Sequence, residues 1–337
     1  MTALAPAVAQ PRRPVPWRRL AWVTWRQHRA ALAGTAALLG GLAGYLLVEG
    51  LIVRHAYAGV TSCRPARSAG CQAVAGMFND DYYGTAQTLS GILQVVPVLI
   101  GVFAGAPLLA RELESGTFRF AWTQGCGRLR WVIAKLLPLA VTVAAAAGAF
   151  SLLFSWYYQP FFAEHADGAL APQLFGLRGV AFAAWTLAAF AIGAFAGVVI
   201  KRTVAAMAAS MAVWAGLDLV TVLFARGHYQ APLVVSGANP GYGNNWVVGQ
   251  WFTGPGGVPV DQTAVRNLVQ HAPPSVQDSA NPNAVLAWLA QRHYTQWWTY
   301  QPHGRFWPFQ LIEGGWLLAL SVLLLAATVW LVRRRAA

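Results

Sequence analysis

Charged residues are scarce in this chain. They make up 10% of its 337 residues, whereas hydrophobic residues make up 57% and the mean hydropathy is +0.45. An ordinary soluble domain carries roughly 25% charged residues, so this composition excludes a soluble globular protein and indicates a membrane protein. Lysine occurs only as Lys135 and Lys201. Together with the abundant alanine and glycine, this usage is typical of a bacterium with a GC-rich genome.

The motifs of several enzyme classes are also missing. A phosphate-binding P-loop needs Gly-Lys-Ser/Thr, but the two lysines follow Ala134 and Ile200. The serine-hydrolase G-x-S-x-G and metalloprotease H-E-x-x-H patterns do not occur, and six of the seven histidines lie in the predicted outer segments with no metal-ligand spacing among them. We therefore expect no catalytic site, cofactor or metal in this chain. Any ATP hydrolysis must come from another polypeptide.

Six apolar runs are long enough to cross a hydrocarbon core of about 30 Å, which takes about 20 helical residues. They cover residues 31–53, 88–109, 131–154, 180–200, 204–225 and 309–332. Backbone in lipid must satisfy its own hydrogen bonds, so the connections between the runs lie outside the membrane. The predicted fold is an all-α polytopic membrane protein with six transmembrane helices.

The basic residues predict the orientation of these spans. Sixteen of the 24 basic residues fall on the side that holds both termini, and nine of the 11 acidic residues fall on the other. By the positive-inside rule, both termini are cytoplasmic in a bacterial cytoplasmic membrane. The predicted divisions are a cytoplasmic tail and interfacial helix (1–30), spans one to five with a cytoplasmic loop at 110–130 (31–225), an extracellular subdomain (226–307), and span six with a basic tail (308–337).

The N-terminal segment predicts a helix that lies on the membrane. Residues 1–16 are rich in proline and arginine and predict a disordered tail. In residues 17–29, Arg18, Trp22, Trp25 and Arg29 share one helical face, which is typical of an amphipathic interfacial helix. Because a span follows at once, this basic face does not favour nucleic-acid binding. The run of roughly 23 apolar residues exceeds the length of a signal-peptide core and predicts a retained span.

The outer segments contain two of the three cysteines, which are too few for a disulfide scaffold. Cys63 and Cys71 share the first outer segment, an oxidising location, and predict a disulfide; the alternative is two free thiols. In the long outer segment, Asp261 predicts a helix to His271 and Asn283 predicts another to about Tyr300. The aromatic residues near its end predict a belt at the outer interface. These are Trp297, Trp298, Tyr300, Phe306, Trp307 and Phe309.

Within the spans, some residues predict packing and others a substrate path. Three Gly-x-x-x-Gly sequences, beginning at Gly40, Gly101 and Gly193, permit close helix approach. Pro97 and Pro138 predict kinks in spans two and three. Acidic residues lie toward the outer ends of three spans, where they serve either a structural role or line a substrate path. These are Glu49, Asp218 and Glu313.

The cytoplasmic loop at 110–130 is the one charge-dense segment between two long apolar runs. Glu112 and Glu114 lie just before Thr117, a predicted helix N-cap. Phe118, Ala121 and Trp122 then fall on one helical face. Exposed aromatics beside basic residues indicate a docking surface. The alternative is that Phe118 and Trp122 merely lie in the headgroup layer.

This loop resembles the loop between spans two and three of type-2 ABC exporter permeases, whose pattern runs R-E-x-E-x-G-T, a short amphipathic helix, Thr-Pro, a basic residue and a lysine early in the next span. Arg111, Glu112, Glu114, Gly116 and Thr117 match its beginning, and Arg128 and Lys135 match its end. The chain departs from the pattern at Thr123-Gln124-Gly125, which stands in place of Thr-Pro. The opening W-V-T-W-R-Q-H-R resembles permease-like proteins of actinobacterial type.

The resemblance implies that the short helix of the loop, with Glu112, Glu114, Gly116, Thr117, Phe118, Ala121 and Trp122, docks on a separate ATPase subunit. It also implies that two permease chains form the pathway. We therefore interpret the chain as the permease of an ABC exporter for a hydrophobic or amphipathic substrate. One alternative is a membrane enzyme acting on lipid at the outer leaflet, with Glu49, Asp218 or Glu313 as acid or base. Another is a non-transporting sensor or immunity component.

Overall fold

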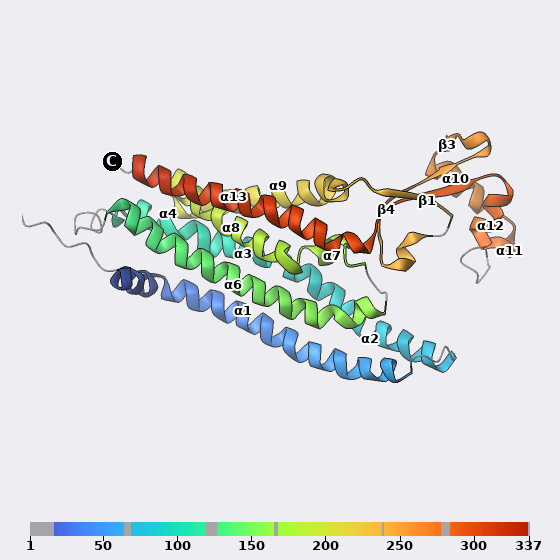
Figure 1. Cartoon of the computed structure of the whole chain (residues 1–337), viewed down its shortest axis with the longest axis horizontal. Coiled ribbons are helices and arrows are strands. Elements are labelled where there is room, and N and C mark those ends of the chain that lie inside the picture. The colour runs from blue at the N-terminus through green and yellow to red at the C-terminus, as the bar shows by residue number, and fades with distance from the viewer. Residues whose placement is uncertain are drawn as a thin grey trace, which may run out of the picture.

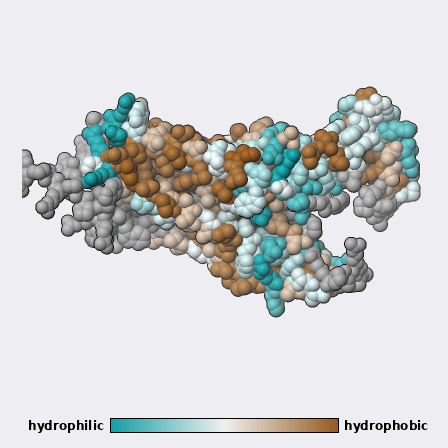
Figure 2. All heavy atoms as spheres, in the orientation of Figure 1, coloured by the Kyte–Doolittle hydropathy of each residue, from teal (hydrophilic) through white to brown (hydrophobic). Residues whose placement is uncertain are grey.

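The computed structural model describes residues 17–63, 69–118, 127–164, 168–237, 239–277 and 284–335. Six helical stretches in them are long and apolar enough to cross a membrane, which confirms the predicted spans. They are Ala36–Ser62, Gly70–Ser115, Arg128–Ala163, Gly179–Ile200, Thr203–His228 and His303–Arg334. Figure 2 shows hydrophobic side chains gathered over the bundle, with hydrophilic side chains toward both ends.

The six spans are built mainly from nine helical segments in the described part of the chain. These are α1 (Trp17–Ser62), α2 (Ala69–Leu93), α3 (Val96–Ile100), the π-helix η1 (Gly101–Gly105), α4 (Ala106–Ser115), α6 (Arg128–Ala163), α8 (Gly179–Ile200), α9 (Thr203–Val220) and α13 (Phe306–Arg335). The start of α1, the end of α4 and the end of α13 lie at one end of the bundle (Figure 1). We refer to this end as the cytoplasmic end, following the charge-based prediction.

Span one and the predicted interfacial helix form one continuous helix, α1. In Figure 1 the first, dark-blue turns of α1 are inclined to the rest of the helix. The side chains of Arg18, Trp22, Trp25 and Arg29 lie outside the described part, so the Arg–Trp face stays a prediction. The tail before Trp17 also lies outside it.

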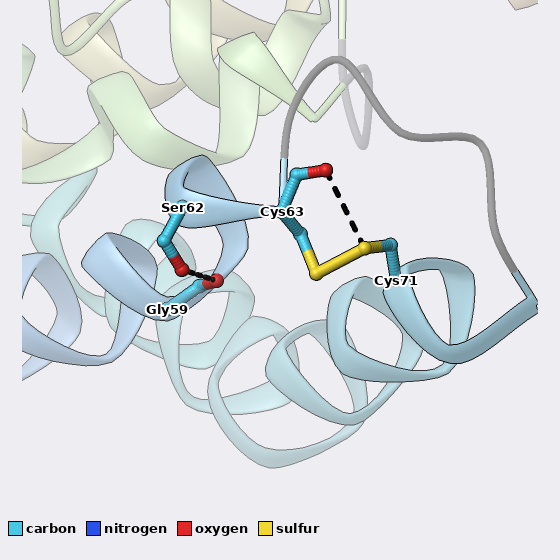
Figure 3. The surroundings of a disulfide bond; sticks show 4 residues. All are labelled: Gly59, Ser62, Cys63 and Cys71. Atoms are coloured by element: carbon cyan, nitrogen blue, oxygen red, sulfur yellow. Dashed lines mark hydrogen bonds between the residues drawn. A yellow bond between two sulfur atoms is a disulfide. The ribbon is translucent and has the colours of Figure 1, made fainter.

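The outer ends of spans one and two are helical, where the sequence indicated only a connecting segment. Cys63 directly follows α1, and Cys71 lies in the first turn of α2. Their sulfurs form a disulfide with the Cα atoms 5.5 Å apart (Figure 3). Ser62 Oγ donates a 2.8 Å hydrogen bond to the carbonyl oxygen of Gly59 within the last turn of α1. The two helices therefore form a hairpin joined covalently at its tip.

The core lies around α8, which contacts α13, α6, α4, η1 and α9. Two of the three glycine motifs make the predicted close approach. A Cβ on Gly193 would lie 2.3 Å from the carbonyl oxygen of Gly101, and one on Gly105 would lie 2.5 Å from that of Phe190. Gly40 and Gly44 have nothing within 4 Å of such a Cβ. Glycine therefore sets the distance between spans two and four, as predicted, whereas the glycine motif of span one makes no such close approach.

The two predicted prolines have different surroundings. Span two is interrupted before Pro97, since α2 ends at Leu93 and α3 begins at Val96. Proline lacks an N–H and clashes with the carbonyl four residues earlier, which accounts for the break. Helix α6 continues through Pro138, where Thr142 Oγ1 donates a 2.8 Å hydrogen bond to the proline carbonyl.

The outer segment between spans five and six contains a sheet, so the all-α prediction is wrong there. Its strands are β1 (Leu233–Ser236), β2 (Trp246–Thr253), β3 (Pro259–Val260) and β4 (Thr295–Gln301), in the order β1-β4-β2-β3 with antiparallel pairing. Short helices α10 (Gln262–Gln270), α11 (Pro274–Gln277) and α12 (Ala284–Gln291) lie beside it (Figure 1). The predicted helix after Asp261 is confirmed as α10, because the Asp261 carboxylate accepts a hydrogen bond from Thr263 N.

The second predicted helix ends early. α12 stops at Gln291, His293 adopts a left-handed conformation (φ 63°), and the chain then enters β4. Aromatic and threonine side chains favour a strand, and the Trp297 ring stacks on Trp251 of β2 with centroids 6.2 Å apart. Trp297, Trp298 and Tyr300 therefore belong to a sheet, and their place in a belt at the outer interface stays a prediction.

Candidate functional site

The cytoplasmic loop leaves the bundle at the end of α4. Helix α4 ends at Ser115, and Gly116 follows in the left-handed conformation with φ 71°. A side chain at this position would be strained, so glycine ends the helix cleanly here. Ser115 Oγ donates a 2.8 Å hydrogen bond to the carbonyl oxygen of Arg111, one turn earlier. The direction of the chain as it enters the loop is thus fixed by Gly116.

Glu112 ties the end of α4 to α6. Its carboxylate forms an ion pair with the ammonium group of Lys135, whose side chain is 3% exposed. The Lys135 Nζ also lies 4.8 Å from the centroid of the Trp131 ring. A buried ion pair of this kind fixes the relative position of the two helices, because breaking it would leave a buried charge without a partner.

Glu114 ties the end of α4 to α9. Its Oε2 accepts hydrogen bonds from Thr203 N, at 2.9 Å, and from Thr203 Oγ1, at 2.7 Å. Thr203 is the first residue of α9, so the carboxylate caps the N-terminus of that helix, where negative charge is favourable. The sequence placed Glu112 and Glu114 on a docking surface, and the structure places both in bonds within the chain.

The predicted apolar face of the loop is described only in part. Phe118 is helical and half-buried, and it packs against the main hydrophobic core of the bundle. Thr117 is exposed, with its hydroxyl 3.0 Å from that of Ser115. Ala121 and Trp122 lie outside the described residues. Phe118 thus anchors the beginning of the loop to the bundle, while the docking role of Trp122 stays a prediction.

Of the three predicted acids, Asp218 and Glu313 both interact with Arg226, whereas Glu49 lies apart from them. Glu313 is fully buried and receives hydrogen bonds at 2.7 and 2.9 Å from Arg226, at the end of span five. Trp185 of α8 and Tyr229 also donate hydrogen bonds to its carboxylate, at 2.7 and 3.0 Å. A carboxylate with four donors is committed to structure and is a poor acid or base.

Asp218 and Glu49 have separate surroundings. Asp218 is half-buried beside Arg226 and lines a water-sized cavity of about 20 Å³ with Trp214. Glu49, on α1, interacts instead with Tyr45 and Tyr157. Arg226 was not predicted as a site residue from the sequence. The available signal was its position directly after the fifth apolar run.

The described part of the chain contains an apolar groove of about 670 Å³. Its walls come from the cytoplasmic half of α1 and from α3, η1, α4, α6, α8 and α9. Leu38, Phe103, Val143 and Phe150 are typical of its lining. A groove of this size is in the range of sites for drug-sized ligands, and none of the three predicted acids lines it.

Comparison with known protein families identifies the family of this chain. Residues 36–226 match the model of the family described as ABC-2 membrane transporter related, and the match covers more than half of the chain. The chain belongs to this family. No curated protein and no solved structure matches it.

Membership of the ABC-2 family points to a permease component of an ABC transporter, a multi-pass membrane protein that is typically non-catalytic and works with an ATPase partner. The matched region holds spans one to five, the cytoplasmic loop and, apart from Gly34, the residues that line the groove. It ends at Arg226, before the outer sheet and span six. The family therefore describes the membrane part of the chain that holds both candidate sites.

Proposed function

We propose that this chain is the permease subunit of an ABC exporter in the bacterial cytoplasmic membrane, and that its cytoplasmic loop docks on a separate ATPase subunit. The observation that carries the proposal is the double attachment of α4, through Glu112–Lys135 to α6 and through Glu114–Thr203 to α9. A loop docked on a moving partner needs a rigid connection to the spans. These two contacts, with Phe118 on the core, supply it.

The connection suggests how ATP hydrolysis would act on the groove. A displacement of the docked loop moves the end of α4, and the two carboxylate contacts pass that displacement to α6 and α9. Helices α4, α6 and α9 all contribute walls to the groove. Nucleotide-driven motion would therefore change the groove itself, as alternating access requires. We further propose that two permease chains form the pathway, with both termini of each in the cytoplasm.

The test is copurification of an ATPase with the tagged chain from native membranes. Trp122→Ala should reduce ATPase recovery roughly thirtyfold, since truncating a buried aromatic anchor often costs about 2 kcal/mol or more. Trp307→Ala, at the exposed start of span six, is the matched control and should leave recovery unchanged. Absence of any ATPase, or equal recovery with both variants, would contradict the docking proposal.

The variant Glu114→Gln distinguishes docking of the ATPase from the transmission of loop motion to α9. Its side chain keeps a hydrogen-bonding oxygen for Thr203 but loses the charge that favours the helix N-terminus. We expect normal ATPase recovery with weakened stimulation of hydrolysis by substrate. Reduced recovery would show instead that Glu114 acts in docking.

A further inference from the structure

The apolar groove has a single charged residue, Arg111, among the described residues that line it. Arg111 lies at the cytoplasmic end, near the end of α4, and its side chain is exposed. The groove also contains three threonines, but each hydroxyl donates to another group of the chain. Thr142 and Thr186 donate to backbone carbonyls four residues earlier, and Thr203 donates to Glu114. The groove is therefore apolar along its length and cationic at one end.

Arg111 has no carboxylate partner in the described part of the chain. The only acidic residues near the cytoplasmic end are Glu112 and Glu114, which are bound to Lys135 and Thr203. The other nine acidic residues belong to the outer half of the predicted topology, so none of them can reach Arg111. An unpaired guanidinium beside an apolar groove favours an anionic group there.

The groove is elongated along the membrane normal. Its lining extends on span two from Arg111 to Val96, fifteen residues or about 22 Å at the helical rise. It is open at Leu38 of α1 and Phe103 of η1, which line it and are 44% and 56% exposed. The outer half of α1 is fastened to α6, where Arg54 Nη2 donates to the carbonyl oxygen of Trp156 at 3.0 Å. A long apolar chain could therefore enter sideways from the inner half of the bilayer.

We propose that the groove binds a long-chain amphiphile with an anionic head group, which enters from the cytoplasmic leaflet and is the cargo of the exporter. The head group pairs with Arg111, and the alkyl chain lies along η1 and α6 toward Phe150. The assignment as cargo rests on the proposed function. The assignment as a binding site does not require an ATPase.

Binding is tested on the full chain in nanodiscs of phosphatidylcholine, with a photoactivatable analogue of oleate whose diazirine lies near the end of the tail. A probe with the same tail and an amine head group is the matched ligand control. We expect adducts on the groove walls, at least about tenfold more with the anionic probe. Arg111→Gln should abolish that preference, whereas Arg130→Gln, an exposed arginine outside the groove lining, should preserve it.

A second variant tests whether the alkyl chain of the probe lies in the groove. Ala146→Phe adds bulk to the groove wall and should reduce labelling by both probes, whatever their head group. Equal labelling by the two probes, or an unchanged preference in Arg111→Gln, would overturn the proposal. The variant Phe103→Cys, made in a Cys126→Ser background, tests whether a second copy of the chain fills the groove instead. Disulfide-linked dimers of this variant together with little probe labelling would also overturn the proposal.

The complex with the ATPase is used to test whether the bound amphiphile is transported cargo or a resident lipid. Oleate should stimulate ATP hydrolysis with the native chain but not with Arg111→Gln, while ATPase recovery stays equal for both. Labelling without stimulation would overturn the cargo assignment and leave a lipid site. Loss of ATPase recovery in the native chain would contradict the proposed function and leave the labelling result unaffected.

Discussion

Helices α8 and α1 both carry a Gly-x-x-x-Gly sequence, and the two helices have opposite surroundings. In the most apolar stretch of span four, 67% of the residues are buried, against 17% in span one. Gly193 lies against Gly101 of a second glycine motif, whereas Gly40 and Gly44 meet nothing within 4 Å. Close approach thus requires small residues on both helices. A single motif shows that a close approach is allowed, and the opposing helix decides whether it occurs.

The same two regions differ in their polar contacts. Trp185 of α8 donates to the buried Arg226–Glu313 pair, which joins span four to spans five and six. Toward its outer end α1 is fastened by three contacts: Gly50 lies against Trp156, Arg54 bonds to α6, and the disulfide joins α1 to α2. The bundle therefore has a fixed centre at α8 and a helix, α1, whose cytoplasmic half borders the groove.

The largest expected effect on stability comes from removing the charge of Glu313, which pairs with Arg226 at the centre of the bundle. Glu313→Gln should lower the free energy of unfolding by about 3–5 kcal/mol, because Arg226 is left buried without a counterion. Glu49→Gln, in α1, should change it by less than about 0.5 kcal/mol. Thermal unfolding in detergent, followed by circular dichroism, measures both. If Arg226→Gln/Glu313→Gln is no more stable than Glu313→Gln, the unpaired charge is not the cause.

The disulfide should matter because it joins the outer ends of α1 and α2 at the tip of their hairpin. Replacing Cys63 and Cys71 by serine should lower the free energy of unfolding by about 2–3 kcal/mol, the entropy expected from closing a loop of this length. Reduction of the native chain should have the same effect. Unchanged stability would show that the contacts of α1 with α6 are sufficient. Alkylation of Cys63 in fresh, unreduced membranes would show that the disulfide does not form there.

Substitutions in the glycine motifs should have the smallest effects on stability, but these effects should differ clearly between α8 and α1. Gly193→Ala should destabilise by about 1–3 kcal/mol, because its Cβ meets backbone that cannot rotate away. Gly44→Ala should be neutral or slightly stabilising, since alanine favours a helix by up to about 1 kcal/mol over glycine. The two melting temperatures in detergent report the difference. Equal shifts for the two variants would remove the distinction between α8 and α1.

The sequence was sufficient to predict the six spans but not the contacts between elements distant in the chain. Six apolar runs of membrane-crossing length predict six helices, because length and hydropathy depend on the local chain alone. The sheet was missed because T-Q-W-W-T-Y-Q follows a helical stretch without a proline, and only pairing with β2 makes it a strand. Arg226–Glu313 joins residues 87 positions apart in the chain, so no local pattern indicates it. Glu112 and Glu114 were recognised as important, but their bonds to Lys135 and Thr203 depend on how three helices pack.

Orientation can be measured independently of any partner. Cysteine introduced at Arg333, an exposed residue near the C-terminus, should resist a membrane-impermeant thiol reagent in intact cells. Cysteine at Ser236, exposed on β1, should react. Both are made in a Cys126→Ser background. The reverse pattern would place the 110–130 loop outside the cell, where it could not meet an ATPase.

The central claim is that the 110–130 loop lies on an ATPase, and Cys126 within that loop allows a direct test. A thiol-reactive photo-crosslinker attached to Cys126 in native membranes should join the chain to a nucleotide-binding subunit, identified by mass spectrometry. Cys126→Ser should abolish the adduct, whereas Trp122→Ala should reduce it. Crosslinks to lipid alone, with no ATPase adduct from the native chain, would contradict the account and place the loop against the membrane.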